Sequence, residues 1–312
     1  GYAKITDKAL AVAVHSNVGL MHASMGVFNA WCDRVPMLIL GATGPLDAAK
    51  RRPWIEWIHT TIDQGSMVRG FTKWDDQPAS PEAAVESIRR AVTLTNTAPS
   101  GPVYINLDVT IQEKEIDVRP TFDDVSHFPT PHNAEPPKAA LEEALRVLSK
   151  ANRPFIFCGR GGRSEAEWHD RIKLAERLNA RTTTHIKLPA GFPTTHPLFI
   201  GETGWRLRGP VLDSIRSADA ILMLDWLDGG NALKLAFPPG SPRPPVINVS
   251  NDFHMHRGWS MDYGGLAAVD VSIPTVPSTA VSALLDGLAN PAPVQQLKEW
   301  DVPPVVGKGD IG

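Results

Sequence analysis

The chain has 312 residues, of which 42% are hydrophobic and 21% charged, and its formal net charge is −3. At about 150 residues per domain, this length predicts two domains that each bury a core. The near-neutral charge and the lack of a long run of like charges argue against nucleic acid or an anionic membrane surface as the partner. They favour small molecules and other protein subunits.

Two cysteines, Cys32 and Cys158, lie far apart in apolar segments, which is typical of buried thiols in a reducing compartment. No apolar run reaches the roughly 20 residues that cross a bilayer, and the N-terminus lacks the basic and apolar regions of a signal peptide. We therefore expect a cytoplasmic protein. Because residues 1–6 lack an initiator Met and resemble the end of a helix, we also expect the chain to be a fragment.

Residues 9–42 predict one supersecondary unit. An apolar run over 9–14 stops at a polar turn over 15–19, a Met/Ala/Gly-rich segment with helical spacing follows, and a second apolar run covers 35–40. This order predicts a buried strand, a turn, a buried helix and a parallel strand. The turn cluster at 41–45 then falls at the carboxyl end of a strand, where open parallel sheets bind ligands.

The rest of the chain predicts an α/β protein with two doubly wound parallel-sheet domains joined by a Pro-rich linker. Strands alternate with helices in both halves, and residues 189–201 are expected to form a long loop. The expected boundaries are a first domain over 1–109, a linker over 110–137, a second domain over 138–288 and a further linker over 289–312.

His15 is the first candidate for chemistry, because it ends a strand at the carboxyl edge of the sheet and imidazole exchanges protons near neutral pH. A strand-end histidine satisfied by a local carbonyl is the alternative. For His22, inside the Met/Ala helix, a structural role is favoured. His59 and Asp63 are four residues apart, so the carboxylate could hold the imidazole, or the two could form an exposed pair.

Three further patterns have a functional and a structural interpretation. Trp54 and Trp57 could line an apolar pocket or a subunit interface. Gly159, Gly161 and Gly162 follow a strand and precede a helix, an arrangement that lets backbone approach a phosphate but that more often reflects tight packing. His254 and His256 have alternate spacing without further ligands nearby, so no metal site is expected in this chain.

Several ordered motifs resemble one family. GYAKIT, AVHSNVGLMHASMGVFNAWCDRVPMLILGA and APSGPVYINLDVTIQ resemble the pyrimidine-binding domain of thiamine-diphosphate-dependent enzymes of the acetolactate synthase and benzoylformate decarboxylase group. RPFIFCGRGGR, AERLNARTTT, LPAGFPTTHPLFIG and SADAILMLD resemble their central domain, in the same order. The resemblance covers nearly the whole chain, and it implies a cofactor held between two subunits of a homodimer or homotetramer.

The resemblance also implies roles for individual residues. His15 matches the active-site histidine of benzoylformate decarboxylase-like members, and Ser16, Asn17 and Gly19 would form the turn beside the cofactor's pyrimidine. His59 and Thr60 fall where synthase members carry a Phe-Gln pair near the thiazolium. The central domain binds FAD in the synthases and adenosine diphosphate or nothing in some decarboxylases, so the resemblance allows a nucleotide beside the glycine turn without requiring one.

Two departures from the family concern the cofactor. The glutamate that activates the aminopyrimidine would precede Gly1, and the domain that holds the diphosphate and Mg²⁺ would follow residue 312, so this chain alone is expected neither to bind nor to turn over thiamine diphosphate. Asp225-Trp226-Leu227-Asp228 stands where flavin-binding members carry an Arg-bearing segment, which argues against FAD.

We therefore expect part of a thiamine-diphosphate-dependent decarboxylase or carboligase that acts on a small-molecule 2-oxo acid. In the alternative interpretation, the chain is a noncatalytic nucleotide-binding or assembly module that retains the fold.

Overall fold

The structure is a computed structural model that describes residues 1–118, 122–188, 190–203, 207–251 and 265–289. The described chain divides into two compact units, one formed by residues 1–133 and the other beginning at residue 134. The division falls inside the segment predicted as a linker. We describe each unit by itself.

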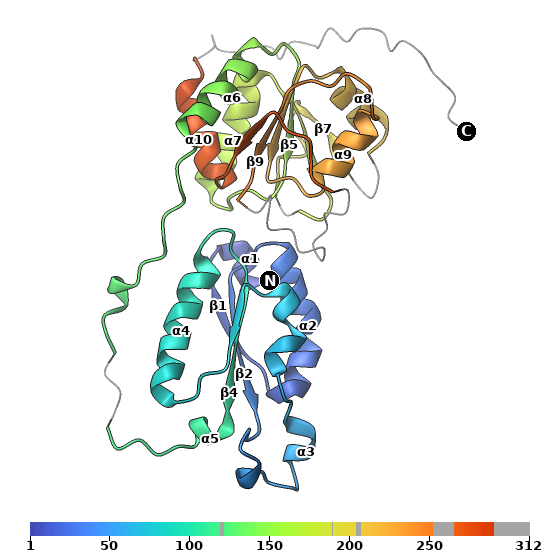
Figure 1. The fold of residues 1–312 in the computed structure, drawn as a ribbon. Coiled ribbons are helices and arrows are strands. Elements are labelled where there is room, and N and C mark those ends of the chain that lie inside the picture. The colour runs from blue at the N-terminus through green and yellow to red at the C-terminus, as the bar shows by residue number, and fades with distance from the viewer. Residues whose placement is uncertain (119–121, 189, 204–206, 252–264, 290–312) are drawn as a thin grey trace, which may run out of the picture. The chain divides into compact units, whose positions relative to one another are not determined.

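Unit 1 is built on a parallel four-stranded sheet with the order β1-β2-β4-β3 (Figure 1). Its strands are β1 (Leu10–Ala13), β2 (Met37–Thr43), β3 (Trp74–Asp76) and β4 (Pro102–Asp108). In the register of the sheet, Met37 of β2 lies opposite Leu10 of β1 and Pro102 of β4. The apolar runs of the sequence thus become adjacent strands, as predicted.

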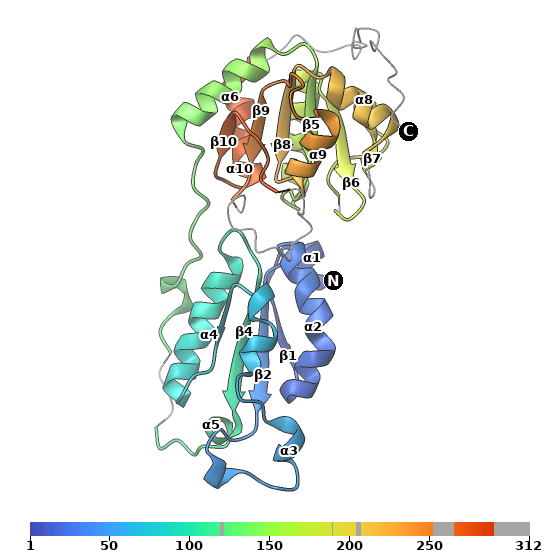
Figure 2. The ribbon, with the colours of Figure 1, turned by 45° about the vertical axis from the view of Figure 1, so that its right-hand side comes forward.

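Two long helices, α2 (Ser16–Cys32) and α4 (Pro81–Asn96), cover opposite faces of this sheet (Figure 2). The pleat sends alternate side chains to each side. One core contains Leu20 of α2 with Ile39 and Tyr104. The other contains Ala91 of α4 with the residues that directly precede or follow Ile39 and Tyr104 in their strands. Pro81 occupies the first turn of α4, and the Ser80 hydroxyl accepts from the Ala83 amide.

The first strand is not buried, contrary to the prediction. Leu10 is 40% exposed, and β1 pairs with β2 on one side while forming the edge of the described sheet. Unit 1 also contains short elements: α1 (Tyr2–Thr6), η1 (Ala48–Lys50), α3 (Glu56–His59), η2 (Gln64–Met67), η3 (Arg69–Phe71), α5 (Val109–Gln112) and η4 (Val125–His127).

Unit 2 contains a parallel six-stranded sheet with the order β10-β9-β8-β5-β6-β7. Its strands are β5 (Pro154–Cys158), β6 (Arg181–His185), β7 (Phe199–Thr203), β8 (Ala220–Leu224), β9 (Val246–Val249) and β10 (Val271–Ile273). The chain runs outward from β5 through β6 to β7 and then resumes at β8 on the other side. The doubly wound class is therefore confirmed in this unit.

Among the described residues of unit 2, five helices form the outer layers, with α6, α7 and α10 on one face of the sheet and α8 and α9 on the other (Figure 1). They are α6 (Lys138–Lys150), α7 (Glu165–Leu178), α8 (Gly209–Ser217), α9 (Gly229–Ala236) and α10 (Pro277–Gly287). Along β5, Ile156 packs toward the first face, and Phe155 and Phe157 toward the second.

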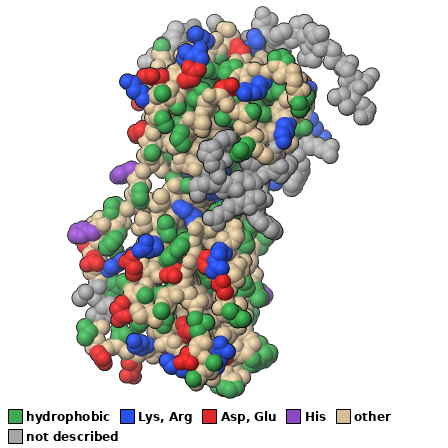
Figure 3. All heavy atoms as spheres, in the orientation of Figure 1, with side chains coloured by type: hydrophobic (Ala, Val, Ile, Leu, Met, Phe, Trp, Pro, Cys, Tyr) green, Lys and Arg blue, Asp and Glu red, His purple; other side chains and the backbone are tan. Residues whose placement is uncertain are grey.

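The expected loop over 189–201 is partly wrong, because β7 begins at Phe199 and pairs with β6 across a register shift between Thr182 and Thr183. The linker predicted over 289–312 lies almost wholly outside the described residues, as do His254 and His256. None of the helices in the described ranges is long and apolar enough to span a membrane. On the face that Figure 3 shows, acidic and basic side chains are interspersed.

Candidate functional site

The turn between β1 and α2 has an unusual backbone. His15 is the N-cap of α2, with φ −79° and ψ 106°, and Ser16 has φ 49°. A left-handed conformation is uncommon for a residue other than glycine, and such residues cluster at functional sites. The Gly19 amide donates to the His15 carbonyl at 2.7 Å, and a Cβ on Gly19 would lie 3.3 Å from the Val14 Cβ. Gly19 therefore lets the helix start close to the end of the strand.

His15 and His59 lie next to each other. Their ring centroids are 4.9 Å apart, and the rings meet edge to face at 87°. His59 is the last residue of α3, and its Nδ1 lies 3.1 Å from the Ile55 carbonyl oxygen. Because a carbonyl can only accept, Nδ1 carries the proton, and Nε2 is left to exchange one. The structure thus brings together the two histidines that the sequence singled out.

Two buried polar atoms without a partner in the described part of the chain lie at the start of α2 and at the end of β2. Among the described residues, Asn17 Oδ1 and Thr43 Oγ1 accept or donate no hydrogen bond, although both atoms are shielded from solvent. The Ser16 hydroxyl lies 3.5 Å from His15 Nδ1, which is a weak contact at best. Buried polar groups usually have partners, so an unsatisfied pair at one edge of a sheet is a sign of a bound group or of water.

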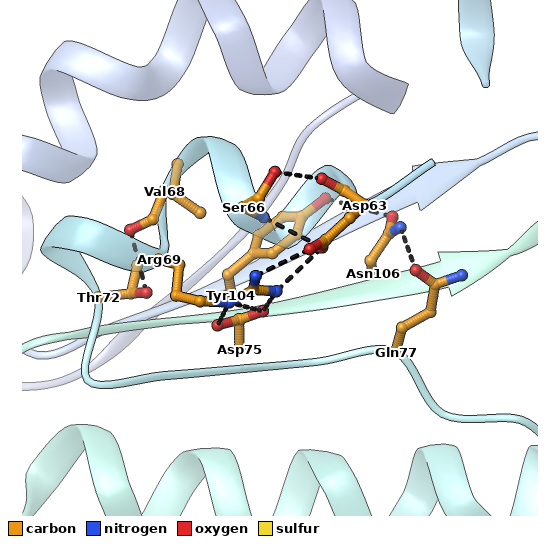
Figure 4. Close-up of polar contacts among 9 residues, drawn as sticks. All are labelled: Asp63, Ser66, Val68, Arg69, Thr72, Asp75, Gln77, Tyr104 and Asn106. Carbon is orange, nitrogen blue, oxygen red and sulfur yellow. Dashed lines mark hydrogen bonds and ion pairs between the residues drawn. The ribbon is translucent and has the colours of Figure 1, made fainter. Parts of the chain in front are cut away.

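Asp63 does not hold His59, so this expected pairing is wrong. The helix ends at His59, and the Asp63 carboxylate instead accepts from Arg69 at 2.8 and 2.9 Å (Figure 4). Arg69 also donates to Asp75 at 2.9 Å, and its hydrogen bonds hold the pKa of Asp63 below the usual value. Asp63 therefore anchors the loop after α3.

A buried polar network beneath this loop has no clear signal in the sequence. Gln64 Nε2 donates to the Tyr104 hydroxyl at 2.7 Å, Tyr104 donates to Asn106 at 3.2 Å, and Asn106 donates to Gln77 at 3.1 Å. A Cβ on Gly41 would overlap the Tyr104 hydroxyl, so Gly41 makes room for this ring. Burial raises the pKa of Tyr104, which therefore stays protonated.

Large apolar side chains are exposed on the two elements next to the histidine pair, the α3 segment and α2. Trp54 and Trp57 are 74% and 76% exposed, on the segment that carries α3. On α2, Val18 and the residues three and seven positions after it are exposed and lie on one face of the helix. His22 is exposed too, rather than buried. The predicted buried helix is therefore buried on one side only. The exposed large apolar residues of α2 are Val18, Met21 and Met25.

The glycine turn of unit 2 lies against the chain itself. A Cβ on Gly159 would overlap the Asp225 and Leu224 carbonyls, and one on Gly162 would overlap the Glu167 carboxylate. A Cβ on Gly161 would lie 2.7 Å from an Arg171 nitrogen. Tight packing therefore accounts for all three glycines, and a phosphate-binding role for Gly159, Gly161 and Gly162 stays a prediction.

The helix that follows this turn is capped internally. The Ser164 hydroxyl accepts from the Glu167 amide, and the Glu167 carboxylate accepts from the Ser164 amide, which is a capping box. Beside it, Arg160 pairs with Asp225 at 2.8 Å, and the Ser250 hydroxyl donates to the same carboxylate at 2.6 Å. The carboxyl ends of β5, β8 and β9 are thus joined by the chain's own polar groups.

Unit 2 has a cavity of about 360 Å³ beside the end of β6. Trp168, His185, Phe192 and Glu202 contribute to its wall. Burial and, to a smaller extent, Lys187 lower the pKa of His185, so its imidazole is neutral at pH 7. Its Nδ1 accepts from the Lys187 amide at 3.1 Å.

No group of three or more histidine, cysteine or acidic residues that could hold a metal ion occurs within the described ranges. The polar groups at the β1–α2 turn fit an organic ring better than a cation. An imidazole pair, a hydroxyl and an amide oxygen can contact ring nitrogens and amino groups, and this donor set lacks the carboxylates that Mg²⁺ prefers.

The chain belongs to the thiamine pyrophosphate enzymes. Residues 1–67 match the family's N-terminal TPP binding domain, and residues 141–255 match its central domain. The first match contains the β1–α2 turn and the histidine pair, and the second contains the glycine turn and the cavity of unit 2.

Similar curated proteins are enzymes by name. A sulfoacetaldehyde acetyltransferase from Rhodobacter capsulatus is 26% identical over 224 residues, which are 72% of this chain and 36% of that protein. The acetolactate synthase large subunit of Corynebacterium glutamicum is 23% identical over 233 residues, 72% of this chain and 35% of the subunit. This chain therefore spans about a third of the length of the curated relatives that it matches.

The fold matches solved structures along more of the chain. Benzoylformate decarboxylase from Polynucleobacter necessarius superposes with a TM-score of 0.68 at 23% identity, over 93% of this chain and 51% of that chain. The agreement supports the fold of the two units as described above.

Proposed function

We propose that this chain forms part of a thiamine-diphosphate-dependent enzyme that decarboxylates a 2-oxo acid or joins the resulting fragment to a second carbonyl compound. The observation that carries the proposal is the His15–His59 pair at the strained β1–α2 turn, within the region that matches the N-terminal TPP binding domain. Thiamine diphosphate, when bound, supplies the electron sink that such a reaction needs.

The residues of the turn fit the pyrimidine side of this cofactor. Asn17 Oδ1 is a buried acceptor without a partner among the described residues, which suits a ring amino group. The Ser16 hydroxyl lies 3.5 Å from His15 Nδ1, Thr60 directly follows His59 in the chain, and Gly19 keeps the helix close to the strand. We propose that these residues orient the ring.

The two imidazoles are proposed to move protons. His15 is exposed at the end of β1, where it can reach a substrate, and a positioned imidazole contributes about 10²–10⁴-fold to a rate. The Ile55 carbonyl accepts the hydrogen bond that His59 Nδ1 donates. We therefore propose that Nε2 is the nitrogen of His59 that exchanges a proton. We propose that the two imidazoles exchange protons with a carbonyl carbon or oxygen of the substrate.

Mg²⁺ and the diphosphate are proposed to bind to a part of the protein other than the described residues, which offer no carboxylate cluster for the ion. We propose a homodimer or homotetramer, because the apolar surface of Val18, Met21 and Met25 on α2 is of a kind that subunits cover. We further propose a cytoplasmic location, because Cys32 and Cys158 are both buried and form no disulfide.

The test is an assay of the full-length protein with thiamine diphosphate, Mg²⁺ and a panel of 2-oxo acids. We expect saturable cofactor binding by calorimetry and loss of the 2-oxo acid with release of CO₂. Absence of cofactor binding by the full-length protein would sink the proposal. No observation favours a noncatalytic nucleotide-binding module, since the matched relatives are named as enzymes.

A further inference from the structure

Glu56 is a buried carboxylate three residues before His59. Its side chain is 4% exposed, although it opens the short helix α3 on an otherwise exposed segment. An acidic residue in such a segment normally faces solvent. A carboxylate that gives up its hydration needs compensating partners, so the partners of Glu56 show what it is built to hold.

Both partners flank α3 in the chain. Arg52 Nε donates to Glu56 Oε1 at 2.7 Å, four residues before Glu56, and the Thr60 hydroxyl donates to Oε2 at 3.4 Å, four residues after it. The Glu56 amide also donates to the Arg52 carbonyl at 3.0 Å. The carboxylate therefore ties the two ends of the α3 segment to each other.

Gly44 leaves the space in which this carboxylate lies against the end of β2. A Cβ on Gly44 would overlap Glu56 Oε2 and the Thr60 hydroxyl, so only glycine leaves room for the carboxylate at the end of β2. The Gly44 amide donates to the His59 carbonyl at 3.1 Å. The α3 segment is thus fixed to β2 at Glu56 and again at His59.

We infer that Glu56 is the positioning residue that keeps the His59 ring edge-on to His15. The role of the histidine pair in proton exchange rests on the proposed function, whereas the role of Glu56 in their contact does not. Without the carboxylate, Arg52 and Thr60 lose their common partner. Of the contacts between α3 and the sheet described above, the Gly44–His59 hydrogen bond then remains.

The contact can be measured in the 312-residue chain without cofactor, as the nuclear Overhauser effect between the ring protons of His15 and His59. Two variants displace the carboxylate in different ways. Glu56→Ala removes it, and Gly44→Ala pushes it from its seat while leaving Glu56 in the sequence. We expect at least a twofold loss of the cross-peak in both, with the thermal transition of unit 1 retained.

Two matched controls test specificity. Glu113→Gln removes the outer partner of Arg52, which lies 3.4 Å away and is 64% exposed, so the cross-peak should stay at its full intensity. Gly70→Ala is the glycine control in the same unit, because no atom lies within 4 Å of its Cβ position. Unchanged cross-peaks in both Glu56→Ala and Gly44→Ala would overturn the inference.

Turnover provides the second readout. In the full-length protein, we expect Glu56→Ala and Gly44→Ala to lower kcat by about ten- to a hundredfold with KM within about twofold, since misplacement by about an ångström costs that much. A change in KM alone would contradict a positioning role. If His15→Ala leaves turnover unchanged, the proposed function of His15 fails, and the cross-peaks still decide the role of Glu56.

Discussion

Both units have a parallel sheet covered by helices, and each contains a turn that follows a strand and opens a helix, but the two turns differ. In unit 1, the β1–α2 turn has a left-handed Ser16 and an amide oxygen of Asn17 without a partner. In unit 2, the β5–α7 turn is packed against Asp225 and capped by Ser164 and Glu167. A shared fold therefore does not by itself indicate a site, and the two turns differ in how far the chain satisfies their polar groups.

The largest effect should come from removing His15, the group of unit 1 that we propose exchanges protons. We expect His15→Ala to lower kcat of the full-length protein by about 100-fold or more. Its unfolding free energy should change by less than about 0.5 kcal/mol, because the side chain is exposed. Steady-state kinetics and urea unfolding measure the two quantities, and unchanged turnover would remove His15 from the reaction.

The next effect should come from forcing open the turn of unit 2. Gly159→Ala places a Cβ against two backbone carbonyls that cannot swing aside, so we expect a loss of about 1–3 kcal/mol in unfolding free energy. Gly26→Ala in α2 is the control, because its Cβ position is open and alanine favours a helix by about 0.5–1 kcal/mol. Equal stability of the two variants would mean that the turn yields without cost.

A smaller effect concerns acid and unit 2. The pKa of His185 is lowered in the folded chain, chiefly by burial, so the unfolded chain takes up this proton first as the pH falls below about 6.5. Stability should therefore decrease between about pH 7 and pH 5. His185→Gln should lessen that decrease in denaturant titrations, and an identical decrease in the variant would assign the effect to other groups.

The smallest signal is expected from nucleotides. Because the glycine turn is filled by Asp225, Arg171 and Glu167, calorimetry of the 312-residue chain with adenosine diphosphate or FAD should show no heat of binding. A saturable heat would instead support the predicted phosphate-binding role of the glycines and would make the two turns alike in function.

The sequence predicted the parts of the fold that periodicity controls. An apolar run over 35–40 predicted β2, and the strand and helix expected on either side of the glycine turn correspond to β5 and α7. It missed β7, because Gly201 and Glu202 interrupt the apolar pattern of this edge strand and the register shifts beside it. The sequence also predicted that β1 is buried, because the composition of a strand does not show whether it has a neighbouring strand on one side or on both.

The sequence singled out the two histidines that the structure brings together, but it did not predict their contact, and their roles stay a prediction. His15 and His59 were singled out separately, from a strand end and from the resemblance to the family, and neither signal placed the two rings together. The expected His59–Asp63 pair failed because the helix ends at His59 and Arg69 competes for the carboxylate. Burial of Glu56 depends on a missing side chain at Gly44, 12 residues away, which no local pattern reports.

The left-handed backbone conformation of Ser16 also restricts which residues can replace it. Glycine, asparagine and aspartate adopt this conformation most readily, whereas valine, isoleucine and threonine clash with their own backbone there. In a library saturated at this position and sorted for folded chains, tolerated residues should therefore rank by backbone freedom rather than by helix propensity or by likeness to serine. Threonine, the nearest chemical analogue, should be among the first lost.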